Sequence, residues 1–173
     1  MTDPAPFVTL MIRPALDADG DAFGRLTARC WADYPGCYYD RRGELADLDR
    51  IASLYEERDG QAWAAISQNR LVGTVAVAPA GQIGDAWEIA KLYVAPDIRR
   101  QNVATLLLDT AEAFVAERGG RRVVLWTDTR FAGAHRFYEQ RGYVQDGRTR
   151  ALHDLSQSVE SFYAKRLVGG PAS

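Results

Sequence analysis

The fold is decided by residues 88–143, which read EIAKLYVAPDIRRQNVATLLLDTAEAFVAERGGRRVVLWTDTRFAGAHRFYEQRGY. This stretch predicts a strand, a polar loop, a helix, a short strand and a second helix, in that order. The loop is residues 99–104, RRQNVA. Backbone N–H groups at a helix start are unpaired and lie at the positive end of the helix dipole, so they attract anions. The stretch therefore predicts that a phosphorylated molecule docks at this loop, and that Tyr138 on the second helix faces the same cleft.

The helix that follows the loop has the clearest amphipathic pattern in the chain. From Val103, apolar residues recur at i+3, i+4, i+8, i+11 and i+12, with Thr110 at i+7, and Gly119-Gly120 ends the helix. The strands on either side, 87–94 and 123–127, complete a strand–helix–strand unit. Such a unit needs a right-handed crossover, so these two strands are predicted to pair in parallel.

The remaining segments predict further strands and two more helices. A hairpin is expected around Gln68-Asn69-Arg70, because asparagine tolerates the left-handed turn conformation. The strand that begins at Tyr143 is expected to pair antiparallel at an edge. The predicted fold class is α/β, with a mixed sheet and helices on its faces. The expected strands are 7–13, 62–67, 71–79, 87–94, 123–127, 143–154 and 159–167, and the expected helices are 17–31, 44–58, the helix from Val103 and the helix ending at Gly142, with an irregular loop at 32–42 and a turn at 81–85.

Length and composition indicate an ordinary globular protein. The 173 residues are expected to form a single domain, 1–173, with a core at about 7–167. A net charge of −2 gives no reason to expect bulk binding to nucleic acid. No apolar run approaches the roughly 18 residues that a membrane span needs, and residues 1–6 lack the features of a signal peptide. The expected location is the cytoplasm, with no membrane partner.

Cysteine and histidine provide no recognisable metal or redox motif. The spacing of Cys30 and Cys37 matches no common zinc or thiol-redox pattern, so both are expected to be reduced thiols with packing roles. The chain has only two histidines, His135 and His153, so a dedicated metal site is not expected.

The polar loop and the tyrosine-bearing helix together resemble the GNAT superfamily of acetyl-CoA-dependent N-acetyltransferases. The cofactor motif of that family, Q/R-x-x-G-x-G/A, maps onto Arg99, Asn102 and Ala104, and residues 137–143, FYEQRGY, match its FYExxGF/Y run. Residues 88–94 are also similar to the family's preceding strand. The resemblance implies the acyl-CoA N-acyltransferase fold, a central, mostly antiparallel sheet in which one parallel strand pair is splayed.

The resemblance also implies a binding mode for acetyl-CoA, the acetyl donor. N–H groups of the loop and helix start would hold the pyrophosphate, helped by arginine charge, and the strand backbone would pair with the pantetheine arm like an added strand. For Arg100 there is an alternative interpretation, in which its charge only faces solvent at the start of the helix. The implied cofactor-binding residues are Leu92, Tyr93, Val94, Arg99, Arg100, Gln101, Asn102, Val103, Ala104, Thr105, Arg130 and Tyr138.

Two departures from the family pattern concern the cofactor. Asn102 stands where the family has its central glycine. Asparagine is among the better substitutes in the left-handed region, but its side chain can crowd the phosphate or add a hydrogen bond. An asparagine that often contacts the pantetheine before the second helix is also missing, and the segment 127–131 reads TDTRF there. In this segment Arg130 is long enough to reach a phosphate.

Two residues are candidates for proton transfer. The resemblance places Tyr138 near the thioester sulfur, where a phenol can protonate the leaving thiolate. In the alternative interpretation Tyr138 is only an aromatic residue that packs in the core. Glu88 aligns with an acidic base of several family members, and the alternative is an exposed carboxylate at a strand end. Alternation puts Glu88, Ala90 and Leu92 on one strand face, unless a bulge near Leu92 alters it. His135 is expected to face solvent or cap a pocket wall.

The acceptor side is expected between the first two helices, where this fold commonly has one wall of its acceptor pocket. Aromatic residues gather there near Asp33 and Asp40. Carboxylates and aromatic faces attract a cationic amine, and the alternative is a loop anchored by buried aromatics. A small cationic amine is favoured over protein N-termini or lysines, neither of which is excluded. The candidate pocket residues are Trp31, Tyr34 and Tyr38.

These inferences predict an N-acetyltransferase that moves acetyl from acetyl-CoA to a primary amine. Transfer is expected to be direct, in a ternary complex, because neither cysteine has a recognisable activating base beside it. Whether the protein forms a homodimer is left open, since dimers are common in the family and no stretch of the sequence identifies an interface. The alternatives are an acyl-CoA-binding module without transferase activity and a structural domain that binds no CoA.

Overall fold

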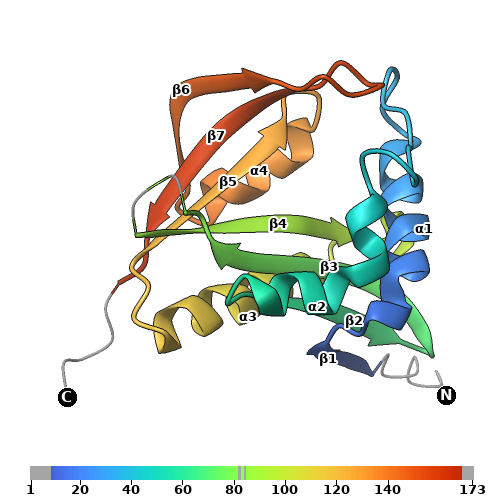
Figure 1. Cartoon of the computed structure of the whole chain (residues 1–173), viewed down its shortest axis with the longest axis horizontal. Coiled ribbons are helices and arrows are strands. Elements are labelled where there is room, and N and C mark those ends of the chain that lie inside the picture. The colour runs from blue at the N-terminus through green and yellow to red at the C-terminus, as the bar shows by residue number, and fades with distance from the viewer. Residues whose placement is uncertain (1–8, 82, 84, 169–173) are drawn as a thin grey trace, which may run out of the picture.

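The computed structural model describes residues 9–81, 83 and 85–168. In this part of the chain seven strands form one sheet, and helices cover its faces (Figure 1). The strands are β1 (Leu10–Pro14), β2 (Gln61–Ser67), β3 (Arg70–Pro79), β4 (Ala86–Val94), β5 (Arg122–Asp128), β6 (Val144–Ala151) and β7 (Val159–Arg166). The α-helices are α1 (Gly20–Trp31), α2 (Ile51–Glu57), α3 (Val103–Glu117) and α4 (Ala132–Gln140), and the 3-10 helices are η1 (Asp17–Asp19), η2 (Ala46–Arg50) and η3 (Pro96–Ile98). None of these helices is both long and apolar enough to cross a bilayer.

The strand order confirms the predicted fold class. It is β1-β2-β3-β4-β5-β7-β6, which Figure 1 shows from β1 at the bottom to β6 at the top. Among the described strands, β4 and β5 form the one parallel pair, and all other neighbours pair antiparallel. The strand after Tyr143 is β6, an antiparallel edge strand as predicted. The sheet is therefore mixed and mostly antiparallel, with α-helices on both faces.

The parallel pair parts halfway along β4. Pairing between β4 and β5 runs from Ala86↔Arg122 to Ile89↔Leu125, although β4 continues to Val94. Beyond the last pair, Lys91 has a positive φ of 57°, and the ladder to β3 is irregular opposite this point. The Thr74 hydroxyl donates a hydrogen bond of 2.7 Å to the Lys91 carbonyl and holds this distorted backbone. The splayed pair that the family resemblance implies is therefore confirmed, and the bulge near Leu92 that the sequence left open is present.

The two faces of the sheet bury side chains of different size. Val75 and Val77 of β3 belong to the core cluster that holds the apolar residues of α3. Ala76 and Ala78 alternate with them and pack with residues of α2 and η2. Since successive side chains of a strand point to opposite faces, α2 and α3 lie on opposite faces of the sheet.

Gly73 lets α3 approach the sheet closely. A Cβ atom built on Gly73 would lie 2.7 Å from Leu107 Cδ1 and 3.1 Å from Val103 Cγ1. Both are closer than normal carbon contacts, so a larger residue at this position would push α3 outward. The first turn of α3, and with it the polar loop before it, is thus set against β3.

The expected helix at 44–58 is wrong as a single element. The chain forms the 3-10 helix η2 and then the short helix α2 from Ile51. Asp17 accounts for the new start, because its Oδ1 accepts hydrogen bonds from the backbone N–H groups of Ala52 (2.8 Å) and Ser53 (2.9 Å). The capping residue lies 35 positions earlier, so helical periodicity within the segment could not reveal the break.

The predicted hairpin is confirmed. Gln68 and Asn69 join β2 to β3 with φ values of 49° and 57°, the left-handed region that asparagine tolerates. The first strand begins later than expected, at Leu10, and the expected positions 7 and 8 lie outside the described residues. Positions 82 and 84 of the expected turn and the tail from 169 also lie outside them.

Candidate active site

The polar loop ends at the N-terminus of α3 in a left-handed backbone conformation. Asn102 has a φ of 61° and Arg100 a φ of 70°. Asn102 therefore adopts the conformation for which the family motif uses glycine, and asparagine is one of the few other residues that reaches it at low cost. The first N–H groups of α3 have no acceptor within the helix. This geometry is a potential anion site, as expected from the sequence.

A cavity of about 520 Å³ opens in front of this loop. One wall is the part of β4 that has separated from β5, and α4 contributes lining residues along its whole length. Gln101 and Arg130 are not among its lining residues. The predicted residues that do line it are Trp31, Tyr34, Leu92, Tyr93, Val94, Arg99, Arg100, Asn102, Val103, Ala104, Thr105 and Tyr138.

A second, smaller cavity of about 100 Å³ lies next to the first. It extends from the parted strands to the loop after α1 and the loop between β6 and β7. The two cavities meet, because six residues line both of them. The shared residues are Trp31, Leu92, Tyr93, Phe131, Ala134 and Tyr138.

Tyr138 stands at the junction of the cavities. The residue is 7% exposed, and among the residues that the structure describes its hydroxyl has no hydrogen-bond partner. Burial raises the pKa of Tyr138, so the phenol keeps its proton at neutral pH. A protonated phenol without a competing partner can donate to an atom that reaches the junction. Nearby, the indole Nε1 of Trp31 donates to the hydroxyl of Tyr93 at 3.1 Å and fixes two more shared residues.

Glu88 lies beside the small cavity without lining it. It occupies the same face of β4 as Ala90, a lining residue, two positions further on. Burial raises the pKa of Glu88, although Arg150 and Arg58 act in the opposite direction. A carboxylate with a raised pKa is a better proton acceptor near neutral pH than an exposed one.

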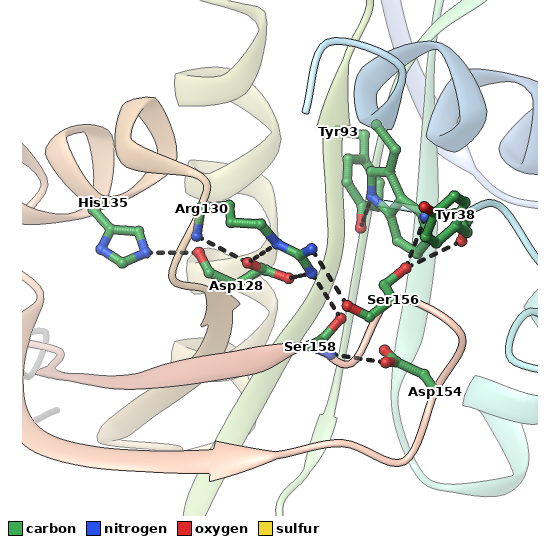
Figure 2. Close-up of polar contacts among 9 residues, drawn as sticks. Tyr38, Tyr93, Asp128, Arg130, His135, Asp154, Ser156 and Ser158 are labelled. Atoms are coloured by element: carbon green, nitrogen blue, oxygen red, sulfur yellow. Dashed lines mark hydrogen bonds and ion pairs between the residues drawn. The ribbon is translucent and has the colours of Figure 1, made fainter. Parts of the chain in front are cut away.

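Arg130 lines neither cavity, and its hydrogen-bond partners lie at the end of β5 and in the loop between β6 and β7. Its guanidinium donates to both carboxylate oxygens of Asp128, at 2.9 and 2.6 Å, and also to Ser158 Oγ (3.2 Å) and Ser156 O (3.4 Å). Figure 2 shows Arg130 between Asp128 on one side and the two serines on the other. Burial opposes the charge of Asp128, but the hydrogen bonds from Arg130 outweigh it and keep the pKa of Asp128 below its usual value.

The same network connects three separate segments. Ser156 Oγ accepts a hydrogen bond of 2.8 Å from the backbone N–H of Tyr38, so the β6–β7 loop is joined to the loop after α1 (Figure 2). His135 Nε2 is 2.9 Å from the backbone oxygen of Asp128 and packs on Tyr163 at a ring distance of 5.4 Å. His135 is half-buried and contacts the end of β5, and it lines neither cavity, whereas the sequence placed it in solvent or at a pocket wall.

The three aromatic residues that the sequence predicted for an acceptor pocket have different positions. Trp31 lines both cavities, and Tyr34 lines only the large one, where it packs on Phe131 at 4.6 Å between ring centroids. Tyr38 is 60% exposed and lines neither cavity. The small cavity is completed by residues that the sequence did not single out as pocket residues, since they come from distant loops and strands. These are Cys37, Glu44, Ile89, Ala90, Lys91, Trp126, Thr127, Asp128, Leu152, Ser156, Ser158 and Glu160.

Comparison with known proteins agrees with this architecture. The family model described as "Acetyltransferase (GNAT) family" matches residues 25–143. The "Probable N-acetyltransferase camello" of Xenopus tropicalis is 27% identical over 121 residues, which cover 70% of this chain and 54% of that protein. The chain thus spans about half the length of this curated relative.

Solved structures share the fold. A GNAT-family acetyltransferase of Staphylococcus aureus Mu50 superposes with a TM-score of 0.80 and 20% identity, over 92% of this chain and 100% of that chain. The yncA acetyltransferase of Salmonella typhimurium, solved with its cofactor acetyl-CoA, has a TM-score of 0.72 and 14% identity, over 94% and 96% of the two chains. At this identity the likeness extends to the fold alone.

Proposed function

The chain belongs to the GNAT acetyltransferase family, and on that premise we propose that it transfers acetyl from acetyl-CoA to a primary amine of a small acceptor. The observation that carries the proposal is the meeting of two cavities at Tyr138. The large cavity has the phosphate-type loop at one end, as acetyl-CoA requires. The small cavity offers an acceptor a separate approach to the same junction.

The donor side rests on backbone groups. N–H groups at the start of α3 and the positive end of its dipole suit a pyrophosphate. The unpaired edge of β4 from Ala90 to Val94 suits the amides of a pantetheine arm. The acetyl-CoA complex of the Salmonella relative supports this choice of donor.

The chemical step needs two proton transfers. The neutral amine attacks the thioester carbon, and collapse of the tetrahedral intermediate breaks the C–S bond. Tyr138 donates its proton to the departing sulfur. The excess proton on the nitrogen leaves through water to Glu88, which lies next to the small cavity. Each residue then returns to its starting state by exchange with solvent.

An acyl-enzyme on cysteine is not part of this proposal. Cys30 is buried, and its Sγ is 3.4 Å from the Val94 carbonyl oxygen. Cys37 lines the small cavity, but burial raises the pKa of both thiols. Since the thiolate is the nucleophilic form, neither cysteine is activated for attack. Both substrates must then bind together.

Thiol release from acetyl-CoA across a panel of primary amines tests the proposal directly. Release that depends on an amine, with acetylated product detected by mass spectrometry, is the expected result. Tight binding of acetyl-CoA without release on any amine would instead indicate an acyl-CoA-binding module. No thermal stabilisation by CoA or acetyl-CoA would contradict both functions.

Replacing Asn102 by glycine tests the unusual cofactor loop. Glycine adopts a φ of 61° without strain and has no side chain near the phosphate. We expect Asn102→Gly to tighten acetyl-CoA binding by about 1 kcal/mol, or roughly fivefold in Kd, as measured by calorimetry. An unchanged or weaker affinity would show that the asparagine side chain contributes a favourable contact.

Replacing Glu88 by glutamine tests the proton acceptor. In the wild type, kcat/KM should fall as the pH drops through the raised pKa of Glu88, because the carboxylate becomes protonated. In Glu88→Gln this acidic limb should disappear, and the plateau should fall about 100-fold. An unaltered pH profile and plateau would remove Glu88 from the mechanism.

A further inference from the structure

The bulge in β4 lies at the small cavity, where β4 has already separated from β5. The ladder between β3 and β4 is shifted between Ala90 and Tyr93, because β3 supplies one residue there and β4 supplies two, Lys91 and Leu92. A bulge of this kind changes the direction in which the side chains of a strand point, and bulges are common next to active sites. All five β4 residues from 89 to 93 line the small cavity.

The bulge decides which face of the sheet each of these side chains joins. Ala90 pairs with Ala76, whose side chain packs with η2 and α2. With regular alternation Lys91 would point to the opposite face, which α3 covers. Its Nζ instead lies 3.0 Å from a carboxylate oxygen of Asp47 in η2, and Leu92 packs against the core cluster that holds α3. The bulge therefore turns Lys91 toward η2 and Leu92 toward α3.

The backbone of Lys91 has an unfavourable conformation that its neighbours hold. Its φ of 57° lies in the left-handed region, which residues other than glycine enter at a cost. On one side, the buried Thr74 hydroxyl donates a hydrogen bond of 2.7 Å to the Lys91 carbonyl. On the other side, the ion pair with Asp47 is partly shielded from water, since the two side chains are only 17% and 31% exposed.

Asp47 contacts the cavity only through Lys91. It lines neither cavity, and its second oxygen, Oδ1, is buried without a partner among the described residues. Without Lys91 this carboxylate would lose its charged partner at a half-buried position. On the strand, Leu92 and Tyr93 follow Lys91 directly and line both cavities. A shift of the backbone at Lys91 would therefore move two residues of the junction.

We propose that Lys91 is a positioning residue, whose ion pair with Asp47 holds the β4 bulge and so places Leu92 and Tyr93 where the acetyl group and the amine meet. This inference rests on the proposed function. In this role Lys91 acts through the backbone of β4 and touches no reacting atom. Misplacing groups around a reacting centre by about 1 Å can slow a reaction roughly 100-fold, so a modest shift of the bulge has a measurable effect.

The test removes the ion pair from either side. Lys91→Met keeps an unbranched side chain and the same backbone preference but loses the charge, and Lys91→Arg keeps the charge. Asp47→Asn breaks the same pair at a residue that lines neither cavity. Lys165→Met is the matched control, because the pair of Lys165 with Glu112 has a similar length of 2.9 Å and similar exposure, 21% and 13%, and neither residue lines a cavity.

We expect Lys91→Met and Asp47→Asn each to lower kcat about tenfold and to leave the acetyl-CoA Kd and the acceptor KM within about twofold of the wild type. The double variant should be no slower than either single variant, because both changes remove one interaction. Lys91→Arg should retain kcat to within about threefold, and Lys165→Met should leave it unchanged.

Two kinetic results would overturn the inference. Wild-type kcat in Asp47→Asn, with a loss only in Lys91→Met, would assign Lys91 a direct contact with a substrate. A change confined to the acceptor KM would assign the pair to acceptor binding instead of positioning.

Hydrogen exchange of the β4 amides, measured by mass spectrometry, separates this inference from the proposed function because it needs no turnover. Peptides that cover β4 should exchange about tenfold faster in Lys91→Met and Asp47→Asn than in the wild type, and should not change in Lys165→Met. Unchanged exchange in the first two variants would refute the inference even in an active enzyme. If the wild type acetylates no amine, the proposed function and the catalytic role of the pair both fail, and exchange still decides whether the pair holds the bulge.

Discussion

Tyr138→Phe is expected to lower kcat about 100-fold and to leave acetyl-CoA affinity within about twofold of the wild type. The substitution removes only the hydroxyl, and the ring keeps its packing on Phe137, Tyr143 and Tyr163. Because the hydroxyl has no partner within the described residues, no existing hydrogen bond is broken. The loss should therefore fall on the step in which the thiolate leaves.

Single-turnover kinetics and calorimetry with acetyl-CoA would separate chemistry from binding in this variant. Tyr163→Phe is the matched control, since Tyr163 is buried close by and its hydroxyl donates to Glu139 at 3.0 Å. It lines neither cavity, so kcat should be nearly unchanged. A Tyr138→Phe enzyme with wild-type kcat would show that the phenol only packs.

The donor side could be predicted from the sequence because its parts are local. The loop, the first turn of α3 and the end of β4 are consecutive in the chain, so one stretch of residues contains the whole arrangement. Even the left-handed conformation at Asn102 follows from residue type, since few residues other than glycine adopt it. The parting of β4 from β5 was expected from the family resemblance, and the register gives its position after Ile89.

Most of the small cavity could not be predicted, because it is assembled from distant segments. Asp128 and Glu160 become neighbours only when the sheet pairs β5 with β7, and Glu44 reaches the same cavity from the segment between α1 and η2. None of them stands in a motif. Arg130 illustrates the limit most clearly, because its charge and position before α4 were compatible with a phosphate. Its partner is instead Asp128, two residues earlier in the chain. Nothing in the sequence favoured this ion pair over a contact with a phosphate.

Arg130→Met is expected to destabilise the protein by about 2 kcal/mol and to raise the acceptor KM. The Asp128 side chain is 8% exposed, so removing its partner leaves a buried charge without compensation. Arg130 is 29% exposed, which reduces the loss below that of a fully buried pair. Thermal unfolding should show a decrease of roughly 4–8 °C in Tm for a chain of this size. Arg50→Met removes the exposed pair with Glu57 and should change Tm little.

The pH dependence of protein stability provides an independent check that the loss in Arg130→Met comes from the broken ion pair. The pKa of Asp128 is lowered in the folded protein, so its stabilising contribution is complete above its unfolded pKa and is lost as the pH falls through the folded pKa. The stability difference between wild type and Arg130→Met should therefore be largest near neutral pH and should shrink below about pH 4. A difference that is independent of pH would point to lost packing instead of a lost ion pair.

The kinetic effect distinguishes the two roles that Arg130 can have. If its guanidinium holds the β6–β7 loop against the end of β5, Arg130→Met raises the acceptor KM and leaves acetyl-CoA affinity unchanged. A variant with Asp128→Asn added should recover part of the stability, because no buried charge remains, but should not restore the loop contacts to Ser156 and Ser158. Weaker acetyl-CoA binding with an unchanged acceptor KM would instead assign Arg130 to the cofactor phosphate.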